Sequence, residues 1–321
     1  MDRKLKWGVL GCAGIAGRCV IPGILMAENA ELYAISSRGI SGKLIDFQQR
    51  FHPVKTCDSY ESMLDDPEVE AVYVPLPNGL HAEWAIRAME KKKHVLCEKP
   101  MGTTVTETGW MLDKARETGM LLMEAFAYLH SPITRRVKDL VDCGAIGNVH
   151  FYDGHFTFNN MAADNVRYNS SLAGGATYDI GCYPISQIRW LLGSEPIGIK
   201  ATGIVGNSGV DISSCSILTF PGDITAVCYC GFEDFPRVEY SVVGETGMIR
   251  VPFSFNYEGD AYIILETQDG TQTLPVNCPH NYMLEIEQFG RAVMDGEPPL
   301  VTPEFTLGNA VVIEEILRQI M

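Results

Sequence analysis

The stretch KWGVLGCAGIAG, residues 6–17, predicts a short buried strand that breaks into a glycine-rich turn. A helix is expected to begin directly after the turn, around Ile15 and Ala16. A strand that feeds such a turn brings backbone N–H groups and a helix N-terminus to one point, which suits the pyrophosphate of a dinucleotide.

The spacing of this turn departs from the usual G-x-G-x-x-G/A pattern, because Ala13 follows Gly11 where a second glycine is expected. An ordinary tight turn in an α/β core is the competing interpretation. The position of the turn favours a dinucleotide site, because the turn opens a βαβ unit. The second strand of this unit, residues 31–36, ends where the ribose of a dinucleotide binds. The expected cofactor contacts in the turn are Gly11, Cys12, Ala13, Gly14, Ile15 and Ala16.

Length, charge and cysteine usage limit the classes of protein. The 321 residues exceed a typical single core and suggest two domains. A net charge of −15 argues against nucleic acid and anionic membrane surfaces as partners, and no apolar run approaches the ~20 residues that span a bilayer. The ten cysteines are scattered without C-x-x-C, and the seven histidines do not cluster. We therefore expect reduced thiols, no metal site and, with no signal peptide evident, a cytoplasmic protein.

The first part of the chain alternates strands with helices. Strand-like runs at residues 31–36, 54–57, 69–77, 94–100 and 120–126 are separated by helical segments at 41–51, 60–64, 81–92 and 106–118. Together with the strand before the glycine turn, this alternation predicts a doubly wound parallel sheet, the Rossmann arrangement, over residues 1–123.

The pattern changes in residues 124–321, which we expect to form a substrate-binding and oligomerisation domain. A helix at 133–142 precedes an alternating run at 151–158, and between residues 197 and 274 strand-like runs follow one another with little helix. This pattern predicts a large, mostly antiparallel open sheet within an α/β domain. Two helices, 282–294 and 306–320, are expected to end the chain.

The tip of the second strand reads Ser36-Ser37-Arg38. Sites that prefer NAD usually carry Asp or Glu here, whereas two hydroxyls and a guanidinium fit the 2′-phosphate of NADP. A charge-assisted hydrogen bond contributes ~1.5–3 kcal/mol, so Arg38 alone can favour NADP by roughly ten- to a hundredfold. A solvated loop arginine is the competing interpretation, and use of both NADP and NAD stays open.

Two further segments lie where the strands of such a sheet end, and ligands bind at that edge. The loop Leu76-Pro77-Asn78 leads to His81, which opens a helix as a cofactor contact or as a structural residue. Glu98-Lys99-Pro100 closes the next strand, and its X-Pro bond can be cis and so fix where Lys99 points. A surface lysine before a turn proline is the competing interpretation.

The order and spacing of GCAGIA, PNGLHAEWA, HVLCEKP, MEAFAY and DIGCYPI over nearly the whole chain resemble the glucose–fructose oxidoreductase/inositol dehydrogenase/MocA family. Within it, DIGCYPIS and SSR are most similar to the NADP-using dihydrodiol and aldose dehydrogenase branch. The resemblance implies a Rossmann domain plus a C-terminal α/β domain whose open sheet often forms a subunit interface.

The resemblance also implies roles for single residues. The EKP lysine of the family falls on Lys99, with Glu98 beside it, and its D-x-G-x-Y/H acid/base pair falls on Asp179 and Tyr183. Asn165 and Arg167 match an N-x-R element that contacts ligand.

One segment departs from the family pattern. Where the family often has EAFMYRxHP, this chain has Leu129 in place of the arginine and His130 moved back one place. Substrate specificity is expected to lie around Tyr128 in this segment and in the loop 156–172.

The chemistry also follows from the residue types. Transfer of a hydride to or from a carbinol requires a group that exchanges the hydroxyl proton. Free tyrosine has a pKa near ~10, and a nearby ammonium such as Lys99 lowers it. Asp179 and Tyr183 are four residues apart, so a helix would place them on one face, with a start or a kink near Pro184. A buried structural phenol is the competing interpretation for Tyr183.

Three functions follow from these observations. The first is an NAD(P)-dependent oxidoreductase, with NADP(H) favoured over NAD(H), acting on a secondary alcohol or carbonyl of a sugar, polyol or diol. The second is a glycoside-cleaving or epimerising enzyme with tightly bound NAD in a redox-neutral cycle. The third is a non-catalytic NADP(H) sensor, which would need neither Lys99 nor the Asp179–Tyr183 pair. We also expect a homodimer or higher homo-oligomer through the C-terminal sheet.

Overall fold

The computed structural model describes residues 3–159 and 165–321. The chain divides into two compact units. The first contains residues 1–127 and 280–306, and the second contains residues 128–279 and 307–321. Each unit has its own sheet and is described by itself.

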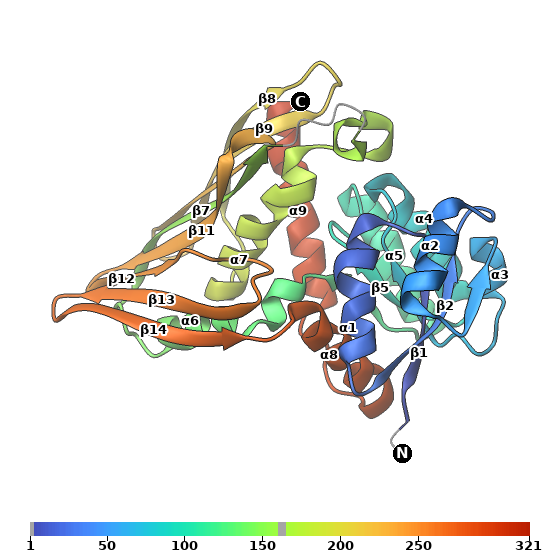
Figure 1. Cartoon of the computed structure of the whole chain (residues 1–321). Coiled ribbons are helices and arrows are strands. Elements are labelled where there is room, and N and C mark those ends of the chain that lie inside the picture. Colours follow the sequence, from blue (N-terminus) through green and yellow to red (C-terminus); the bar gives the residue numbers. More distant parts are fainter. Residues whose placement is uncertain (1–2, 160–164) are drawn as a thin grey trace. The chain divides into compact units, whose positions relative to one another are not determined.

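The first unit is built on a six-stranded sheet with the order β3-β2-β1-β4-β5-β6, in which all neighbouring strands are parallel. The order reverses beside β1, as in a doubly wound Rossmann sheet, so that part of the expected fold is confirmed. Figure 1 labels β1, β2 and β5 of this sheet, together with α2, α4 and α5 of the same unit. The strands are β1 (Leu5–Leu10), β2 (Ala30–Ser36), β3 (Lys55–Cys57), β4 (Ala71–Val74), β5 (His94–Glu98) and β6 (Leu122–Ala125).

Helices connect these strands at the places that the sequence predicts. Side-chain caps start several of them, as where Ser41 Oγ accepts from Leu44 N–H and Thr104 caps α5 through Glu107 N–H. Gly119 ends α5 in the left-handed conformation. The helical segments are η1 (Ala16–Val20), α1 (Ile21–Met26), α2 (Gly42–Phe51), α3 (Tyr60–Leu64), η2 (Asn78–Leu80), α4 (His81–Glu90) and α5 (Val105–Thr118).

Helix α8 (Asn281–Asp295) belongs to the first unit although it follows the second unit in sequence. Its Phe289 is fully buried, and its ring centroid lies 4.9 Å from that of Trp7 in β1. Asn29 Nδ2 donates to the carbonyl of Glu287 at 2.8 Å. A single cut between residues 123 and 124 does not describe this division, because the apolar face of α8 completes the core around β1.

The second unit contains an eight-stranded sheet with the order β14-β13-β12-β11-β7-β10-β9-β8. Its pairs are antiparallel except for β7 and β10, which confirms the mostly antiparallel sheet. The strands are β7 (Val149–Asn159), β8 (Gly198–Val205), β9 (Asp211–Phe220), β10 (Ile224–Gly231), β11 (Glu233–Gly244), β12 (Gly247–Val251), β13 (Gly259–Thr267) and β14 (Gly270–Cys278).

The sequence did not predict the two edge strands, β8 and β14, as separate strands. Both are largely exposed and carry little alternation of apolar residues. Pro275 lies within β14, which is tolerated because an edge strand pairs along one side only.

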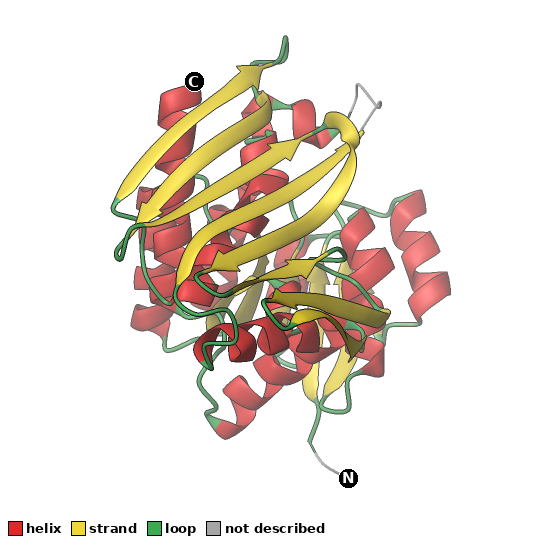
Figure 2. Ribbon diagram, turned by 90° about the vertical axis from the view of Figure 1, so that its left-hand side faces the viewer, coloured by secondary structure: helices red, strands yellow, loops and turns green. Residues whose placement is uncertain are grey.

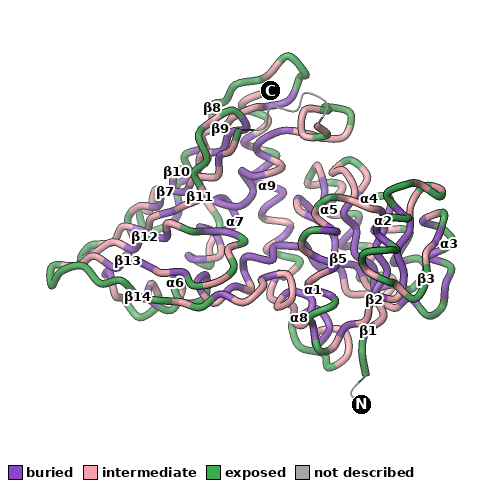
Figure 3. The backbone as a smooth tube through the Cα atoms, in the orientation of Figure 1, coloured by how far each residue is buried: buried purple, intermediate pink, exposed green. Residues whose placement is uncertain are grey.

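Helices of the second unit lie on one face of its sheet (Figure 2). Helix α7 (Cys182–Leu192) contacts β7 and β10, and α6 (Pro132–Asp142) contacts β13 and β14. Residues 182–189 of α7 are all buried (Figure 3). The other helical segments of the unit are η3 (Ala127–His130), η4 (Val166–Tyr168), η5 (Ser170–Leu172), η6 (Thr177–Gly181) and α9 (Pro303–Ile320). The unit boundaries cut two of them, so that η3 belongs to the second unit from Tyr128 onward and α9 from Leu307 onward.

Candidate active site

The glycine turn follows β1 at the carboxyl edge of the first sheet. Gly11 has φ +102°, and a Cβ there would lie 3.2 Å from Tyr60 Oη and 3.3 Å from Leu76 Cδ2. Its N–H donates to the carbonyl of Ser36 at 3.0 Å. Only glycine fits this position easily, and the turn leaves Gly14 exposed where the next helix begins. Cys12, Ala13 and Ile15 are half-buried and Ala16 is buried, so the accessible part of the turn fits a dinucleotide phosphate.

The tip of β2 differs in one residue from the expected 2′-phosphate site. Ser36 is fully buried, and its hydroxyl donates to the carbonyl of Val9 at 3.2 Å. Ser36 therefore ties β2 to β1 and does not offer a hydroxyl to a ribose phosphate. Ser37 is half-buried with its Oγ 3.3 Å from Ser41 Oγ, and Arg38 is exposed. Two of the three residues thus remain accessible for an anion.

His81 has a structural role. It is fully buried, with Nδ1 2.9 Å from the carbonyl oxygen of Pro100 and Nε2 2.7 Å from that of Leu76. Burial lowers the pKa of its imidazole below the usual value. The ring joins the loop after β4 to the loop after β5, so its nitrogens are turned toward backbone and not toward a ligand. Leu76, Pro77 and Asn78 stay half-buried at the sheet edge.

The end of β5 presents Lys99. The Lys99–Pro100 bond is cis, as the sequence allowed, and Lys99 is half-buried. The carboxylate of Glu98 is turned toward protein, because Tyr73 Oη donates to Oε1 at 2.5 Å and Lys99 N–H donates to Oε2 at 3.2 Å. Burial, followed by the charge of Glu98, raises the pKa of Tyr73 well above its usual value. Glu98 therefore braces the backbone at Lys99.

In the second unit, Tyr183 is the second residue of α7 and is 8% exposed. The π-helical segment η6 precedes α7 without a break in the helical backbone, and Pro184, which has no N–H to donate, follows directly after this wider turn. Helical backbone therefore begins before Tyr183, and the start or kink expected near Pro184 takes the form of a change from π-helix to α-helix just before it. Asn256 Nδ2 donates to Tyr183 Oη at 3.2 Å.

Asn165, Arg167 and Asp179 come together near the start of η6. Arg167 Nε donates to Asp179 Oδ2 at 2.5 Å in an ion pair, and Arg167 N–H donates to Asn165 Oδ1 at 3.1 Å. The sequence named these three residues from two separate motifs, and the structure brings them into one cluster. Residues 160–164 of the expected specificity loop lie outside the described residues.

The ring of Tyr128 packs against the ring of Tyr183. Tyr128 is 1% exposed, its Oη lies 2.7 Å from Ser186 Oγ, and its ring centroid lies 5.5 Å from that of Tyr183. Burial raises the pKa of the Tyr128 phenol well above its usual value. Its hydroxyl is therefore held within the unit, and a direct contact with substrate stays a prediction.

Sequence reasoning missed Asp211, which anchors the segment that carries Asp179. Asp211 is 1% exposed, and its Oδ2 accepts from both the N–H and the Oγ1–H of Thr177 at 2.7 Å. Gly175, at φ +130°, leaves room for this carboxylate, because a Cβ there would overlap its Oδ1. Asp211 and Asn256 are distant in sequence from the D-x-G-x-Y motif, and no local pattern marks either residue.

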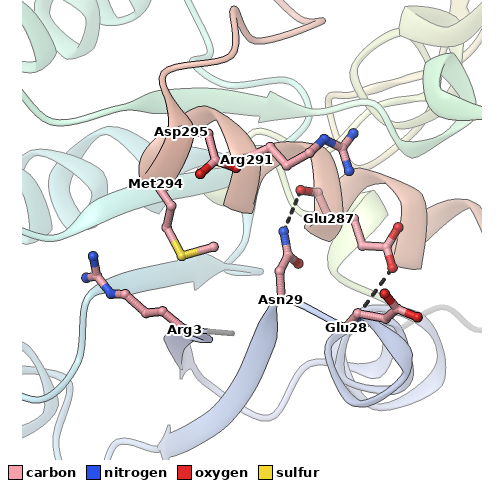
Figure 4. A pocket seen from close by; sticks show the side chains of 7 residues that line it. All are labelled: Arg3, Glu28, Asn29, Glu287, Arg291, Met294 and Asp295. Carbon is pink, nitrogen blue, oxygen red and sulfur yellow. Dashed lines mark hydrogen bonds between the residues drawn. The ribbon is translucent and has the colours of Figure 1, made fainter. Parts of the chain in front are cut away.

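A hollow of about 550 Å³ in the first unit lies away from these residues (Figure 4). Arg3 and Asn29, which line it, precede β1 and β2, so it lies at the edge where the strands begin. Its cations are already paired, Arg3 with Glu70 and Arg291 with Glu297. These features do not suit a dinucleotide, which binds where the strands end.

Within residues 3–159 and 165–321, no group of three or more His, Cys, Asp or Glu side chains is arranged to hold a metal ion. In the same part of the chain, no helix has the length and apolar character needed to cross a membrane.

Two family models match the chain. The model described as an oxidoreductase family with an NAD-binding Rossmann fold matches residues 5–126. The model described as the GFO/IDH/MocA C-terminal domain matches residues 134–250. The two matches cover the sheet with the glycine turn and the segment that carries Asp179 and Tyr183.

Several known proteins are similar over the chain. An NADP⁺-dependent D-xylose 1-dehydrogenase from Haloferax volcanii is 34% identical over 97% of this chain and 96% of its own length. A trans-1,2-dihydrobenzene-1,2-diol dehydrogenase from Xenopus tropicalis is 28% identical over 77% and 75%. The crystal structure of a 3-ketoreductase from Actinomadura kijaniata, in complex with NADP and TDP-benzene, matches with a TM-score of 0.93, 31% identity and coverage of 99% and 98%.

Proposed function

Because this chain belongs to the GFO/IDH/MocA family of oxidoreductases, we propose that it oxidises or reduces a CH–OH or carbonyl group of a sugar, polyol or diol with NADP(H). Relatives that act on a pentose, on a keto sugar and on a diol support this substrate class. The observation that carries the proposal is Tyr183, which is held by Asn256 and follows Asp179, the partner of Arg167, by four residues in one continuous helical segment.

The residues of the first unit fit a dinucleotide. Gly11, at φ +102°, lets the backbone of the turn pass close to Tyr60 and Leu76, and the exposed Gly14 lies at a helix N-terminus that favours an anion. Arg38 offers a guanidinium at the tip of β2, which favours NADP over NAD. NADP would supply the hydride acceptor or donor when bound. NAD(H) is the alternative cofactor.

Tyr183 is proposed to exchange the hydroxyl proton of the substrate at its Oη. A phenol at its ordinary pKa near ~10 is a weak base at neutral pH, so it requires stabilisation of the phenolate. The Asn256 amide donates to this oxygen, and the ammonium of Lys99 is proposed to assist by its charge. Asp179, paired with Arg167, is proposed to orient the substrate together with Asn165.

The test is a steady-state assay with aldoses, polyols and diols and with both NADP⁺ and NAD⁺. We expect Tyr183→Phe and Lys99→Met to lower kcat by about a hundred- to ten-thousandfold, because each removes a group that handles the proton. Cofactor titration by fluorescence provides the control, since Tyr183→Phe leaves the dinucleotide contacts intact. Full turnover in both variants would refute the assigned roles.

The redox-neutral alternative has a distinct signature. A glycoside-cleaving or epimerising enzyme would purify with tightly bound NAD and show no net cofactor turnover. A sensor would bind NADP(H) without turnover of any substrate, and it would not need Lys99 or Tyr183.

We also propose that the protein is a cytoplasmic homo-oligomer. The ten cysteines are free thiols, which suits a reducing compartment. The face of the second sheet opposite α7 carries apolar side chains, among them Ile217, which is 46% exposed, and Val227 beside it. A second copy of the chain would cover this face.

A further inference from the structure

The loop 252–258 between β12 and β13 reaches the hydroxyl of Tyr183. Asn256 Nδ2 donates to Tyr183 Oη at 3.2 Å, from a residue 73 positions further along the chain. Tyr183 itself is buried, whereas Asn256 lies at the exposed margin of the unit. The loop thus brings a side-chain N–H donor from an exposed residue to the phenol oxygen.

Packing holds the loop in place. Phe255 is 7% exposed, and its ring centroid lies 5.2 Å from that of Tyr183, 5.1 Å from that of Tyr128 and 5.7 Å from that of Phe156. The ring stacks on Phe156 with an interplanar angle of 5°. Aromatic pairs at these separations add favourable energy beyond their burial, so Phe255 anchors the loop to the same cluster that surrounds Tyr183.

The backbone of the loop adopts an unusual conformation. Phe255 and Asn256 have φ values of 55° and 47°, both in the left-handed region. Asparagine tolerates this region, but for a bulky residue such as phenylalanine it is costly. Such conformations persist where surrounding contacts impose them, and they concentrate at functional sites. Here they direct the Asn256 amide toward Tyr183.

We propose that Asn256 is a positioning residue for Tyr183, whose amide N–H orients the phenol oxygen and favours the phenolate. The proposal rests on the function proposed above. A hydrogen bond donated to the charged form of an acid lowers its pKa. An N–H group cannot accept a proton, so this bond does not take up the phenol proton that Tyr183 exchanges.

The direct test is a titration of the tyrosines labelled with carbon-13 at Cζ, followed by NMR on cofactor-free protein. Tyr183→Phe assigns the Tyr183 resonance. In Asn256→Gly, which keeps a positive φ without strain, we expect the pKa of Tyr183 to rise by about one unit. In Asn256→Asp we expect a larger rise, because a carboxylate adds negative charge and no donor. Asn207→Asp, in an exposed turn, is the matched control and is expected to leave it unchanged.

The kinetic test is the pH dependence of kcat for alcohol oxidation. Its ascending limb is expected to move upward with the NMR titration in both Asn256 variants and to stay in place in Asn207→Asp. An unchanged Tyr183 titration in folded Asn256→Gly and Asn256→Asp would overturn the inference and leave the proposed function intact. Full turnover in Tyr183→Phe would instead refute the role of Tyr183 itself.

Discussion

Neighbouring side chains in the first unit differ in their exposure to solvent, and therefore in whether their polar groups can contact a ligand. Ser36 is fully buried, and its hydroxyl donates to the carbonyl of Val9, whereas Arg38, two residues further along, is exposed. The strand β2 ends at the buried Ser36, Ser37 N–H still donates to the carbonyl of Cys57 in β3, and Arg38 lies beyond this last sheet contact. Preference for NADP is therefore expected to depend on Arg38 and, to a smaller extent, on Ser37.

Replacing Arg38 tests this preference. In Arg38→Ala we expect kcat/KM with NADP⁺ to fall roughly ten- to a hundredfold, because a charge-assisted bond to the 2′-phosphate contributes ~1.5–3 kcal/mol. The value with NAD⁺, which lacks that phosphate, is expected to change little and serves as the internal control. An equal loss with both cofactors would assign Arg38 to a part of the dinucleotide that NADP and NAD share.

At the scale of elements, η6 and α7 carry Asp179 and Tyr183, and both depend on residues far along the chain. Asp211 in β9 accepts two hydrogen bonds from Thr177 at the start of η6. Thr177 Oγ1 also lies 2.8 Å from Ser214 Oγ, and Gly175 supplies the space beside the carboxylate. This buried polar network holds the beginning of the helix against the sheet.

The carboxyl of Asp211 predicts a pH-dependent stability. Burial raises its pKa from 3.8 to about 6, although the bonds from Thr177 oppose this rise. A pKa raised in the folded state means that the protonated form is favoured on folding. The resulting stability is complete below pH ~4 and is lost as the pH rises through about 6. The loss amounts to at most about 3 kcal/mol in the free energy of unfolding.

Asp211→Asn is expected to remove this decline, because the carboxamide keeps an oxygen for Thr177 without a charge to bury. Urea unfolding between pH 4 and 8 measures the effect. Asp269→Asn, in an exposed turn, is the control and should unfold with the pH dependence of the parent. The same decline in Asp211→Asn as in the parent would assign the titration to other groups.

At the scale of the whole molecule, the second sheet presents one face without helices among the described residues of its unit (Figure 2). Ile217 of β9 pairs with Val227 of β10, so apolar side chains adjoin across the strands on this face. The overall net charge of −15 favours solubility, and any association has to overcome it. Burial of the apolar face is the contribution that opposes this repulsion.

Sedimentation velocity of the parent and of Ile217→Asp tests the oligomer. The parent is expected to sediment as a dimer or larger species, and Ile217→Asp as a smaller one, because a charge on a buried interface is costly. Val54→Asp places the same charge on an exposed apolar residue of the first unit and should leave the mass unchanged. A monomeric parent at micromolar concentration would refute the proposal.

The sequence determined the parts of this protein that depend on local pattern. The parallel sheet and its carboxyl edge were predictable because each signal for them is contained in a short stretch of sequence. These signals are the turn at Gly11, the alternation of strands and helices, and the apolar run of β4. Short motifs and their resemblance to a family likewise singled out Lys99, Asp179 and Tyr183 as candidate site residues, and their roles stay a prediction.

Only the tertiary structure decided which of the candidate side chains are accessible to a ligand and which are bonded within the protein. Ser36 and His81 are buried with their polar atoms against backbone carbonyls, and α8 packs in the first unit although it follows the second unit in sequence. The tertiary structure also brought Asn256 to Tyr183 and Asp211 to Thr177. These are contacts between residues far apart in the chain, where packing and the need to pair buried polar groups outweigh any local preference.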